Sequence, residues 1–287
     1  MSVFLQATYE GLINGAIYAM VAMGISLVWG VMGILSFSQG EFLMIAMFIT
    51  YFFSTYTGLV PVLALPISMG VLFLLGFVVY KTIIYKALQG PTLSQRLITF
   101  ALSMVLTNGM LMAFGGTFKT IQNTGMDGSI NVAGVLTIAK NRIFPVIIAT
   151  CICVFMLWFL NKTKQGKAIR ATSMDKQAAE LVGIDTEKSY SLAFGLSAAI
   201  AGAAGVALSY YYYCYPSVGA NFQLFSFIAV VMGGFGSVEG AIVGGLIMGL
   251  IDSYTGVYFN TAFKYLGVCL VFMLILQFKP KGLFGGK

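Results

Sequence analysis

Long runs of apolar residues alternate with short polar connections along almost the whole chain. Nine runs can be recognised, and most are long enough for a helix that crosses a bilayer, which takes about 20 residues. The runs lie at about 9–32, 39–56, 61–80, 97–115, 144–161, 190–213, 222–233, 237–254 and 262–278. We therefore expect an all-α fold: one polytopic membrane bundle of about eight to nine transmembrane segments, in a single domain that covers residues 1–287.

One of these runs, 222–233, is too short to cross a membrane. Its 12 residues span about 18 Å of helix, against a hydrocarbon core of about 30 Å. It leads into the glycine-rich stretch 233–240, and irregular backbone at membrane depth survives only where protein or a water-filled cavity satisfies its amides. A broken or re-entrant pair of half-helices is expected here, as transporters have near their pathway. The stretch 35–41 is weakly similar to 233–240, because it also combines a Gly/Ser turn with a Glu. This similarity raises the hypothesis of an internal structural repeat.

Composition supports a membrane protein and removes several classes of chemistry. Apolar residues make up 59% of the 287 residues and charged residues 9%, whereas a soluble domain is about 25% charged. There is no histidine, which excludes a Ser-His-Asp triad and a His-ligated metal. No phosphate-binding G-x-x-x-x-G-K-[ST] loop occurs, so any ATP must be used by another polypeptide. The four cysteines are interpreted as packing residues. We expect no catalytic residue, no metal site and no cofactor bound by this chain.

The net charge of +7 is a topology signal and not a sign of nucleic-acid binding, because the cations lie in the connections between apolar runs. Twelve of the sixteen fall in 81–96, 162–189 and the tail from 279. The positive-inside rule places these segments and the C-terminus in the cytoplasm and, with nine crossings, the N-terminus outside. The first run has no basic segment before it and is expected to remain as a helix. The remaining four cations lie on the opposite side of the membrane in this topology: Lys119, Lys140, Arg142 and Lys264.

Polar side chains within the apolar runs are the candidates for a transport pathway. A carboxylate in hydrocarbon costs at least about 2.5 kcal/mol, so each one deserves a functional hypothesis. Four carboxylates fall in or beside apolar runs. Glu10, Glu41 and Glu239 lie near helix starts, where the helix dipole favours an anion without any function. Asp252 either lines a polar cavity or ends a helix at the outer surface. The candidate pathway residues are Asn14, Ser36, Gln39, Glu41, Glu239 and Asp252.

Small residues spaced four apart form stripes that let helices approach closely in lipid. We interpret these stripes as packing within one subunit, with contact to a second transmembrane subunit as the alternative. The stripes are Gly11, Gly15 and Ala19; Ser197, Ala201, Gly205 and Ser209; Gly236, Gly240 and Gly244; and Gly245 and Gly249.

The connection 162–189 is the one long, highly charged segment. Ser173 and Asp175 are residue types that cap a helix N-terminus, and Gly183 is a natural C-terminal cap. Between them, alanine and leucine favour a helix. We therefore expect a short cytoplasmic helix that serves as a docking element for a partner.

Three stretches together resemble a known family. Gly166-Lys-Ala-Ile-Arg-Ala171 followed by Ala178-Ala-Glu-Leu-Val-Gly-Ile184 is similar to the cytoplasmic G-[RK]-A-x-R-A…A-x-L-x-G-I signature of LivH-type permeases of branched-chain amino acid ABC importers, the hydrophobic amino acid uptake family. The stretch 14–24 with 33–41, and the stretch 229–241, resemble the family's N-terminal motif and its A-x-x-L-G-G-x-G-S-x-x-G-A motif. The family usually has His and Asn where this chain has Gln39 and Ser36, so urea or an amide stays open as the substrate.

The resemblance implies a permease subunit, without its own ATPase site, in a bacterial inner or plasma membrane. It implies two cytoplasmic ATP-binding subunits that use ATP and Mg²⁺, a second permease subunit of the LivM type or a second copy, an external substrate-binding protein, membrane lipid, and no nucleic acid. It also implies that the 162–189 loop couples transport to ATP hydrolysis. The residues expected to do so are Gly166, Arg170, Ala171, Asp175, Ala179, Glu180, Leu181, Gly183 and Ile184.

Two other functions use similar features. An ion-driven secondary transporter would need the intramembrane carboxylates, so Asp252→Asn would abolish its uptake. A passive channel would show flux without ATP or a gradient. An intramembrane enzyme is disfavoured because no nucleophile and base pair is visible.

Overall fold

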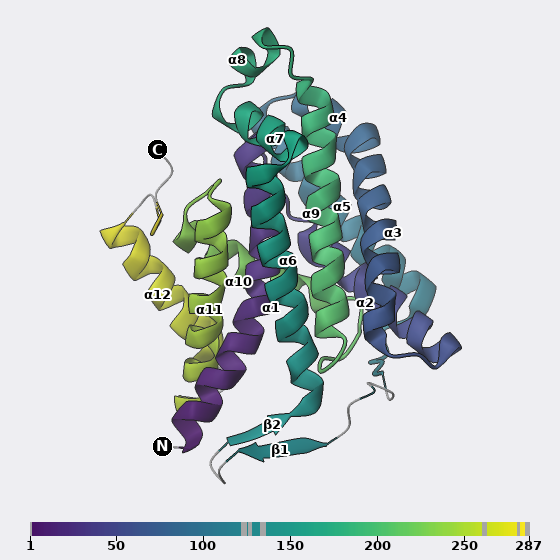
Figure 1. The fold of residues 1–287 in the computed structure, drawn as a ribbon, viewed down its shortest axis with the longest axis vertical. Helices are drawn as coiled ribbons and strands as arrows, with labels where there is room; N and C mark the ends of the chain where they lie inside the picture. Colours follow the sequence, from purple (N-terminus) through teal and green to yellow (C-terminus); the bar gives the residue numbers. More distant parts are fainter. Residues whose placement is uncertain are drawn as a thin grey trace.

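The computed structural model describes residues 2–121, 125, 128–132, 136–259, 263–279 and 282–284. These residues form one helical bundle with a small β-hairpin at one end (Figure 1). The helices and strands are α1 (Ser2–Met32), α2 (Gln39–Thr57), α3 (Leu65–Val79), α4 (Tyr85–Leu88), α5 (Thr92–Phe114), β1 (Ser129–Val132), β2 (Leu136–Ala139), α6 (Ile143–Lys162), α7 (Lys164–Met174), α8 (Lys176–Leu181), α9 (Thr186–Leu208), α10 (Val218–Gly233), α11 (Val238–Tyr258) and α12 (Lys264–Phe278), with short η1 (Pro61–Ala64), η2 (Tyr80–Ile84) and η3 (Lys140–Arg142) between them. The expected helical fold is confirmed, with the antiparallel β1–β2 pair as a small addition.

Each of the nine apolar runs contains a helix. Six helices within the described residues are long and apolar enough to cross a membrane: Val3–Met32, Pro61–Leu88, Thr92–Phe114, Lys140–Lys162, Thr186–Leu208 and Val238–Tyr258. Two further apolar helices, α10 and α12, are shorter. The chain is therefore a multi-pass membrane protein, with these helices as candidate spans.

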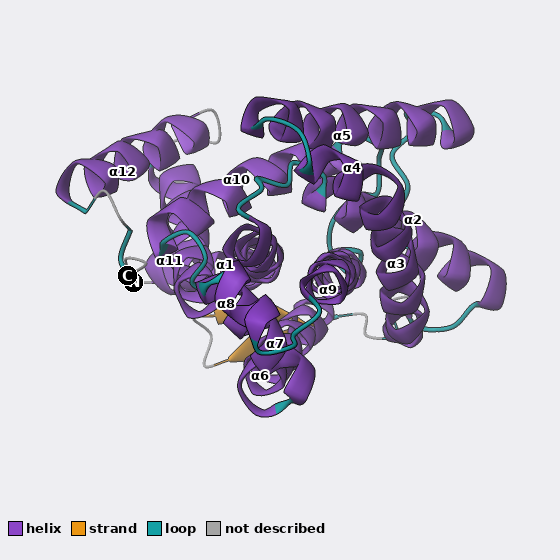
Figure 2. Ribbon diagram, turned by 90° about the horizontal axis from the view of Figure 1, so that it is seen from above, coloured by secondary structure: helices purple, strands orange, loops and turns teal. Residues whose placement is uncertain are grey.

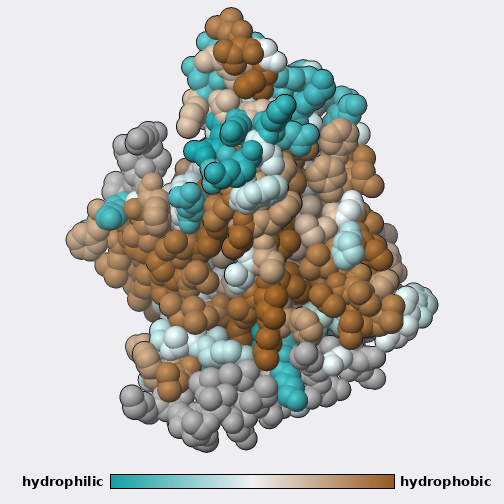
Figure 3. All heavy atoms as spheres, in the orientation of Figure 1, coloured by the Kyte–Doolittle hydropathy of each residue, from teal (hydrophilic) through white to brown (hydrophobic). Residues whose placement is uncertain are grey.

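Polar and apolar surfaces separate along the long axis of the bundle. The connection that contains α7 and α8 projects at one end, together with α4, and the β-hairpin lies at the opposite end (Figure 1). Hydrophilic side chains gather on the α7–α8 end and a broad apolar belt follows below it (Figure 3). The predicted grouping of 81–96 with 162–189, opposite Lys140 and Arg142, is thus confirmed; Lys281 and Lys287 lie outside the described residues. We refer to these two ends as the α8 end and the hairpin end.

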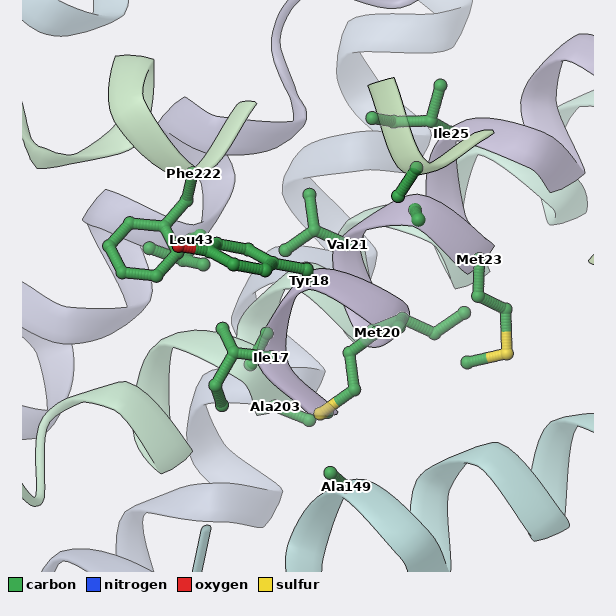
Figure 4. Packing of buried hydrophobic residues seen from close by; sticks show 14 of the residues in the cluster. Ile17, Tyr18, Met20, Val21, Met23, Ile25, Leu43, Ala149, Ala203 and Phe222 are labelled. Carbon is green, nitrogen blue, oxygen red and sulfur yellow. The ribbon is translucent and has the colours of Figure 1, made fainter. Parts of the chain in front are cut away.

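Helix α1 forms the centre of the bundle. Seen along the axis, it lies between α6, α9, α10 and α11, while α5 and α12 are peripheral (Figure 2). Residues 17–28 of α1 are buried without exception, which is typical of a helix that is apolar on all sides. Its side chains Ile17, Met20 and Val21 pack against neighbours from α2, α6, α9 and α10 (Figure 4).

The small-residue stripes bring helices of this one chain together. A Cβ atom built on Gly249 of α11 would lie 2.2 Å from the backbone nitrogen of Gly15 in α1, and one built on Gly245 would lie 2.4 Å from the Cα of Ala19. Gly205 of α9 likewise approaches α2, because its Cβ would lie 2.4 Å from the carbonyl oxygen of Leu43. The interpretation as packing within one subunit is confirmed for these stripes.

Candidate functional site

Two helices begin inside the bundle, and their first turns meet. Helix α2 follows the non-helical segment 33–38, and α10 follows 209–217. A Cβ on Gly40 would lie 2.2 Å from the carbonyl oxygen of Gly219, and one on Gly219 would lie 2.4 Å from the carbonyl oxygen of Gly40. Only glycine at both positions permits this contact. The positive ends of two helix dipoles therefore come together at one point, which we call the α2–α10 junction.

The side chain of Gln223 ties the junction together. Its Oε1 accepts a hydrogen bond from the Gly40 N–H (2.7 Å), and its Nε2 donates to the carbonyl oxygen of Ser36 (3.1 Å). One buried side chain on α10 thus satisfies backbone groups on both sides of the start of α2. The motif analysis missed this residue, because only the three-dimensional contact links Gln223 with a segment about 185 positions earlier.

The junction lies well below the α8 end. Gln39 Oε1 lies beside Gly24 of α1, and Gly24 precedes the end of α1 at Met32 by about 12 Å of helix. Farther along, the ring of Tyr18 in α1 packs on Phe222 of α10, with 5.6 Å between ring centroids. Segment 33–38 thus descends into the bundle from the α8 end before α2 begins.

The irregular backbone inside the bundle is not where the glycine pattern placed it. The turn Gly233–Gly240 lies at the α8 end, where Gly236 contacts Gly30 near the end of α1 and shares a pocket with Asn161. The expected break at 233–240 is therefore not confirmed as irregular backbone inside the bundle. Helix α10 starts inside the bundle, so its 16 residues reach the α8 end just where the glycines occur. The non-helical segment that precedes α10 is 209–217, and it connects the hairpin end with the junction.

Three candidate pathway residues gather at the junction. Ser36, Gln39 and Glu41 are all buried, at 0%, 0% and 3% exposure. Glu41 accepts a hydrogen bond from Ser103 of α5 (3.1 Å), and Ser36 shares one with Ser38 (3.2 Å).

Unused hydrogen-bonding capacity surrounds these residues. Within the described part of the chain, neither amide atom of Gln39 has a partner, nor do the hydroxyls of Ser197 and Ser226. A buried polar atom without a partner costs about 1–3 kcal/mol. The junction is consequently a polar centre that is suited to water or to the polar part of a solute.

Asn14 and Asp252 belong to a second polar cluster, nearer the hairpin end. The Tyr18 hydroxyl donates to Asp252 Oδ2 (3.3 Å), and Lys264 Nζ lies 3.5 Å from Asp252 Oδ1. The Asp252 side chain is only 4% exposed, so it is a buried, paired carboxylate and does not end its helix at the surface. The Tyr211 hydroxyl donates to Asn14 Oδ1 (3.2 Å).

An ion pair extends this second cluster toward the hairpin. Arg142 Nη1 lies 3.2 Å from Glu10 Oε1, and its guanidinium stacks 5.6 Å from the centroid of the Tyr211 ring. The sequence analysis did not select Tyr18, Arg142 or Tyr211 for the site. Their partners are remote in the sequence, although tyrosine beside a carboxylate in an apolar run is a signal that points to such a cluster.

Glu239 lies apart from both clusters. It is in the first turn of α11 at the α8 end, where the N-cap Ser237 accepts a hydrogen bond from the Gly240 N–H (3.0 Å). This position agrees with the simpler interpretation of a carboxylate at a helix start. The six candidate pathway residues therefore lie in three places, and only three of them meet.

The connection at the α8 end contains the predicted short helix. Asp175 adopts an extended backbone and its Oδ1 accepts from the Ala178 N–H (3.0 Å), which caps α8 as expected. Gly183 has φ +84° and ends the helix, also as expected. Ser173 is not a cap; it lies within α7 and its hydroxyl donates to the carbonyl oxygen of Arg170 (2.7 Å).

The base of this connection is tightly anchored. Gly166 contacts α6 so closely that a Cβ would lie 2.2 Å from the carbonyl oxygen of Phe159. Glu180 Oε1 accepts from the Thr186 hydroxyl (2.8 Å), which links α8 with the start of α9. The pKa of Asp185 is lowered because its carboxylate accepts from the Lys188 N–H and pairs with the Lys188 ammonium.

The tip of the connection exposes apolar side chains beyond the apolar belt. Leu181 is 88% exposed, Val182 75% and Met174 79%, and apolar surface is visible at this tip in Figure 3. Ala179, on the opposite face of α8, is buried. Exposed apolar groups in a polar region mark a protein-protein contact. Val182 and Met174 were not among the predicted coupling residues, although both adjoin them.

Comparison with known proteins identifies relatives over nearly the whole chain. The family described as "Branched-chain amino acid transport system / permease component" matches residues 7–277. The high-affinity branched-chain amino acid transport system permease protein BraD of Pseudomonas aeruginosa is 27% identical over 295 residues, which cover 98% of this chain and 96% of the relative. LivH of Escherichia coli K12 is 27% identical over 305 residues, with the same coverage. The xylose transport permease XylH of Haemophilus influenzae is 32% identical over 117 residues, 38% of this chain. No solved structure matches.

Proposed function

This chain belongs to the family of branched-chain amino acid transport system permease components, and on that premise we propose that it is the membrane-spanning subunit of an ABC importer for branched-chain or related hydrophobic amino acids. The observation that carries the proposal is the family match over residues 7–277. The lack of a phosphate-binding loop in the sequence means that partner subunits bind and hydrolyse ATP with Mg²⁺. The chain itself is a permease and binds no cofactor of its own.

We assign the α8 end to the cytoplasm. The cation excess of the connections 81–96 and 162–189 supports this orientation through the positive-inside rule, and the C-terminus is then also cytoplasmic. The hairpin end faces outward, where an external binding protein delivers the amino acid. The membrane is the bacterial cytoplasmic membrane, as the relatives imply.

Nine crossings follow if α12 also crosses the membrane and if irregular segments complete α2 and α10. Helix α10 is 16 residues long, or about 24 Å, which is less than the hydrocarbon thickness of about 30 Å. Segment 209–217 supplies the rest of that crossing, and 33–38 does the same for α2. The broken pair of half-helices is then α2 and α10, each completed by an irregular segment.

The α2–α10 junction is the proposed part of the pathway that this chain contributes. Helix N-termini favour an anionic group such as the substrate carboxylate, and Gln39, Ser36 and Glu41 add polar partners. A second permease subunit, either a related chain or another copy, completes the pathway. Asn14 and Asp252 belong to the second polar cluster near the hairpin end, and Glu239 is not part of the proposed pathway.

The α7–α8 connection is the proposed coupling element. The exposed tip Leu181–Val182 fits an apolar groove on an ATP-binding subunit, while the anchored base at Gly166 transmits motion of that tip to α6. Closure of two ATP-binding subunits would move α8, and the bundle would change between outward-facing and inward-facing states.

The test is to purify the tagged chain from its native membrane in mild detergent and to identify the proteins that copurify. ATPase activity is then measured with leucine and the host's external binding proteins. Recovery of ATP-binding subunits whose hydrolysis rises with one loaded binding protein is the expected result. Recovery of the chain alone, under conditions that preserve a known ABC complex, would overturn the proposal in favour of an ion-coupled transporter or a channel.

A further inference from the structure

A separate pocket opens at the α8 end, between α6, α7 and the first turn of α11. Its volume is about 290 Å³, at the lower end of the range for small-molecule sites. Leu157, Leu160 and Val238 form an apolar wall, and Arg170 and Glu239 bring two opposite charges to the same cavity. This pocket is distinct from the α2–α10 junction, which shares none of these residues.

Arg170 and Glu239 are both exposed and form no ion pair with each other. Among the ion pairs of the described residues, none involves Arg170 or Glu239. Arg170 Nη1 donates to Asn161 Oδ1, which also lines the pocket. A guanidinium has five N–H donors in a fixed fork, so this one bond orients the group and leaves donors for a carboxylate. Glu239 provides an acceptor for a cation in the same small space.

We propose that this pocket binds a free hydrophobic α-amino acid. Its carboxylate would bind Arg170, its ammonium group would bind Glu239, and its aliphatic side chain would lie against Leu157 and Leu160. An anionic lipid headgroup or free phosphate would satisfy Arg170 but would bring negative charge next to Glu239. The combination of two opposite, unpaired charges with an apolar wall therefore selects a zwitterion with an apolar side chain.

Occupancy of this pocket would affect the transport cycle, an inference that rests on the proposed function. Helix α7 packs against α6, α9 and α1, and the pocket lies between α7 and the start of α11. A ligand bound to Arg170 and Glu239 joins these two segments and stabilises the arrangement that contains the pocket. Because α7 belongs to the proposed coupling element, amino acid that accumulates in the cytoplasm would slow ATP hydrolysis.

The experiment uses the complete importer in nanodiscs. Binding of radiolabelled leucine is measured without the binding protein, and ATPase activity is measured with saturating loaded binding protein and increasing free leucine. Val238→Trp fills the pocket, and Val243→Trp is the matched control on the outward face of the same helix, where Val243 is 36% exposed. We expect inhibition by leucine in the parent and the control, and about a tenfold or larger rise in the inhibitory leucine concentration for Val238→Trp and Glu239→Gln.

Leucine analogues identify the ligand chemistry. Leucinol lacks the carboxylate and isocaproate lacks the ammonium group, so neither should compete with leucine. Competition by isocaproate or inorganic phosphate as strong as that by leucine would overturn the proposal in favour of an anion site, and so would inhibition that Val238→Trp leaves unchanged. If no binding protein stimulates the ATPase, the proposed function fails, while loss of leucine binding in Val238→Trp still tests the pocket on its own.

Discussion

Replacing Gly183 tests the coupling role of α8 through backbone conformation alone. Gly183 has φ +84°, and a Cβ built on it meets nothing within 4 Å. Substitution by valine therefore causes no clash, and its cost comes from the left-handed backbone, about 1–2 kcal/mol or somewhat more for a β-branched residue. That energy shifts a local equilibrium about 5–30-fold. The end of α8 would then leave its present conformation, and with it the exposed tip at Leu181 and Val182.

The assay is ATP hydrolysis by the reconstituted importer with and without loaded binding protein. Gly183→Val should lower the stimulated rate several-fold, while the melting temperature of the bundle changes little, because the residue is exposed and makes no packing contact. Gly183→Asn is the matched control, since asparagine tolerates the left-handed region, and it should retain most of the stimulation. Normal stimulation in the valine variant, or equal loss in both, would refute a coupling role that depends on this conformation.

Three further predictions concern other parts of the chain. Leu181→Glu should reduce copurification of ATP-binding subunits at unchanged thermal stability, because the side chain is 88% exposed and its only loss is a partner contact. Gly219→Ala should impair folding, measured as a lower yield of monodisperse protein in detergent, because its Cβ would lie 2.4 Å from the Gly40 carbonyl oxygen. Lys264→Met should lower the melting temperature, since it leaves Asp252 buried without its cation, a loss of about 3–5 kcal/mol for a fully buried pair and less here because Lys264 is 30% exposed. Adding Asp252→Asn should restore part of that stability.

The positions of the helices were predictable from the sequence. Whether each helix faces lipid or other helices was not. The apolar run 9–32 has the same character whether it faces lipid or protein, and only the structure shows α1 buried at 17–28. The run 190–213 extends past the end of α9 at Leu208, because tyrosines 210–213 count as apolar although they lie outside the helix. The Tyr210 hydroxyl accepts from the Val62 N–H (2.9 Å), which fixes that turn through a contact about 150 residues away.

Local chemistry explains which parts of the site were predictable. The cap at Asp175 and the stop at Gly183 depend on neighbouring residues only, and both are confirmed. The α2–α10 junction depends on Gly40 and Gly219, each of which is one glycine among 34 in the chain. Nothing local distinguishes them, so the sequence analysis selected the denser glycine cluster at 233–240 instead.

The packing of the helices supports a different internal repeat from the one that the Gly/Ser turns indicated. Helix α1 packs on α11 and α10, and α9 packs on α3 and α2, so α1, α2 and α3 correspond to α9, α10 and α11. In this alignment the start of α10 at Val218, and not the turn 233–240, corresponds to the start of α2 at Gln39. The two halves run in opposite directions, since α2 extends from the junction toward the hairpin end and α10 toward the α8 end. An inverted arrangement of this kind relates the two helix N-termini by a two-fold axis, and glycine at both Gly40 and Gly219 lets them meet at that axis.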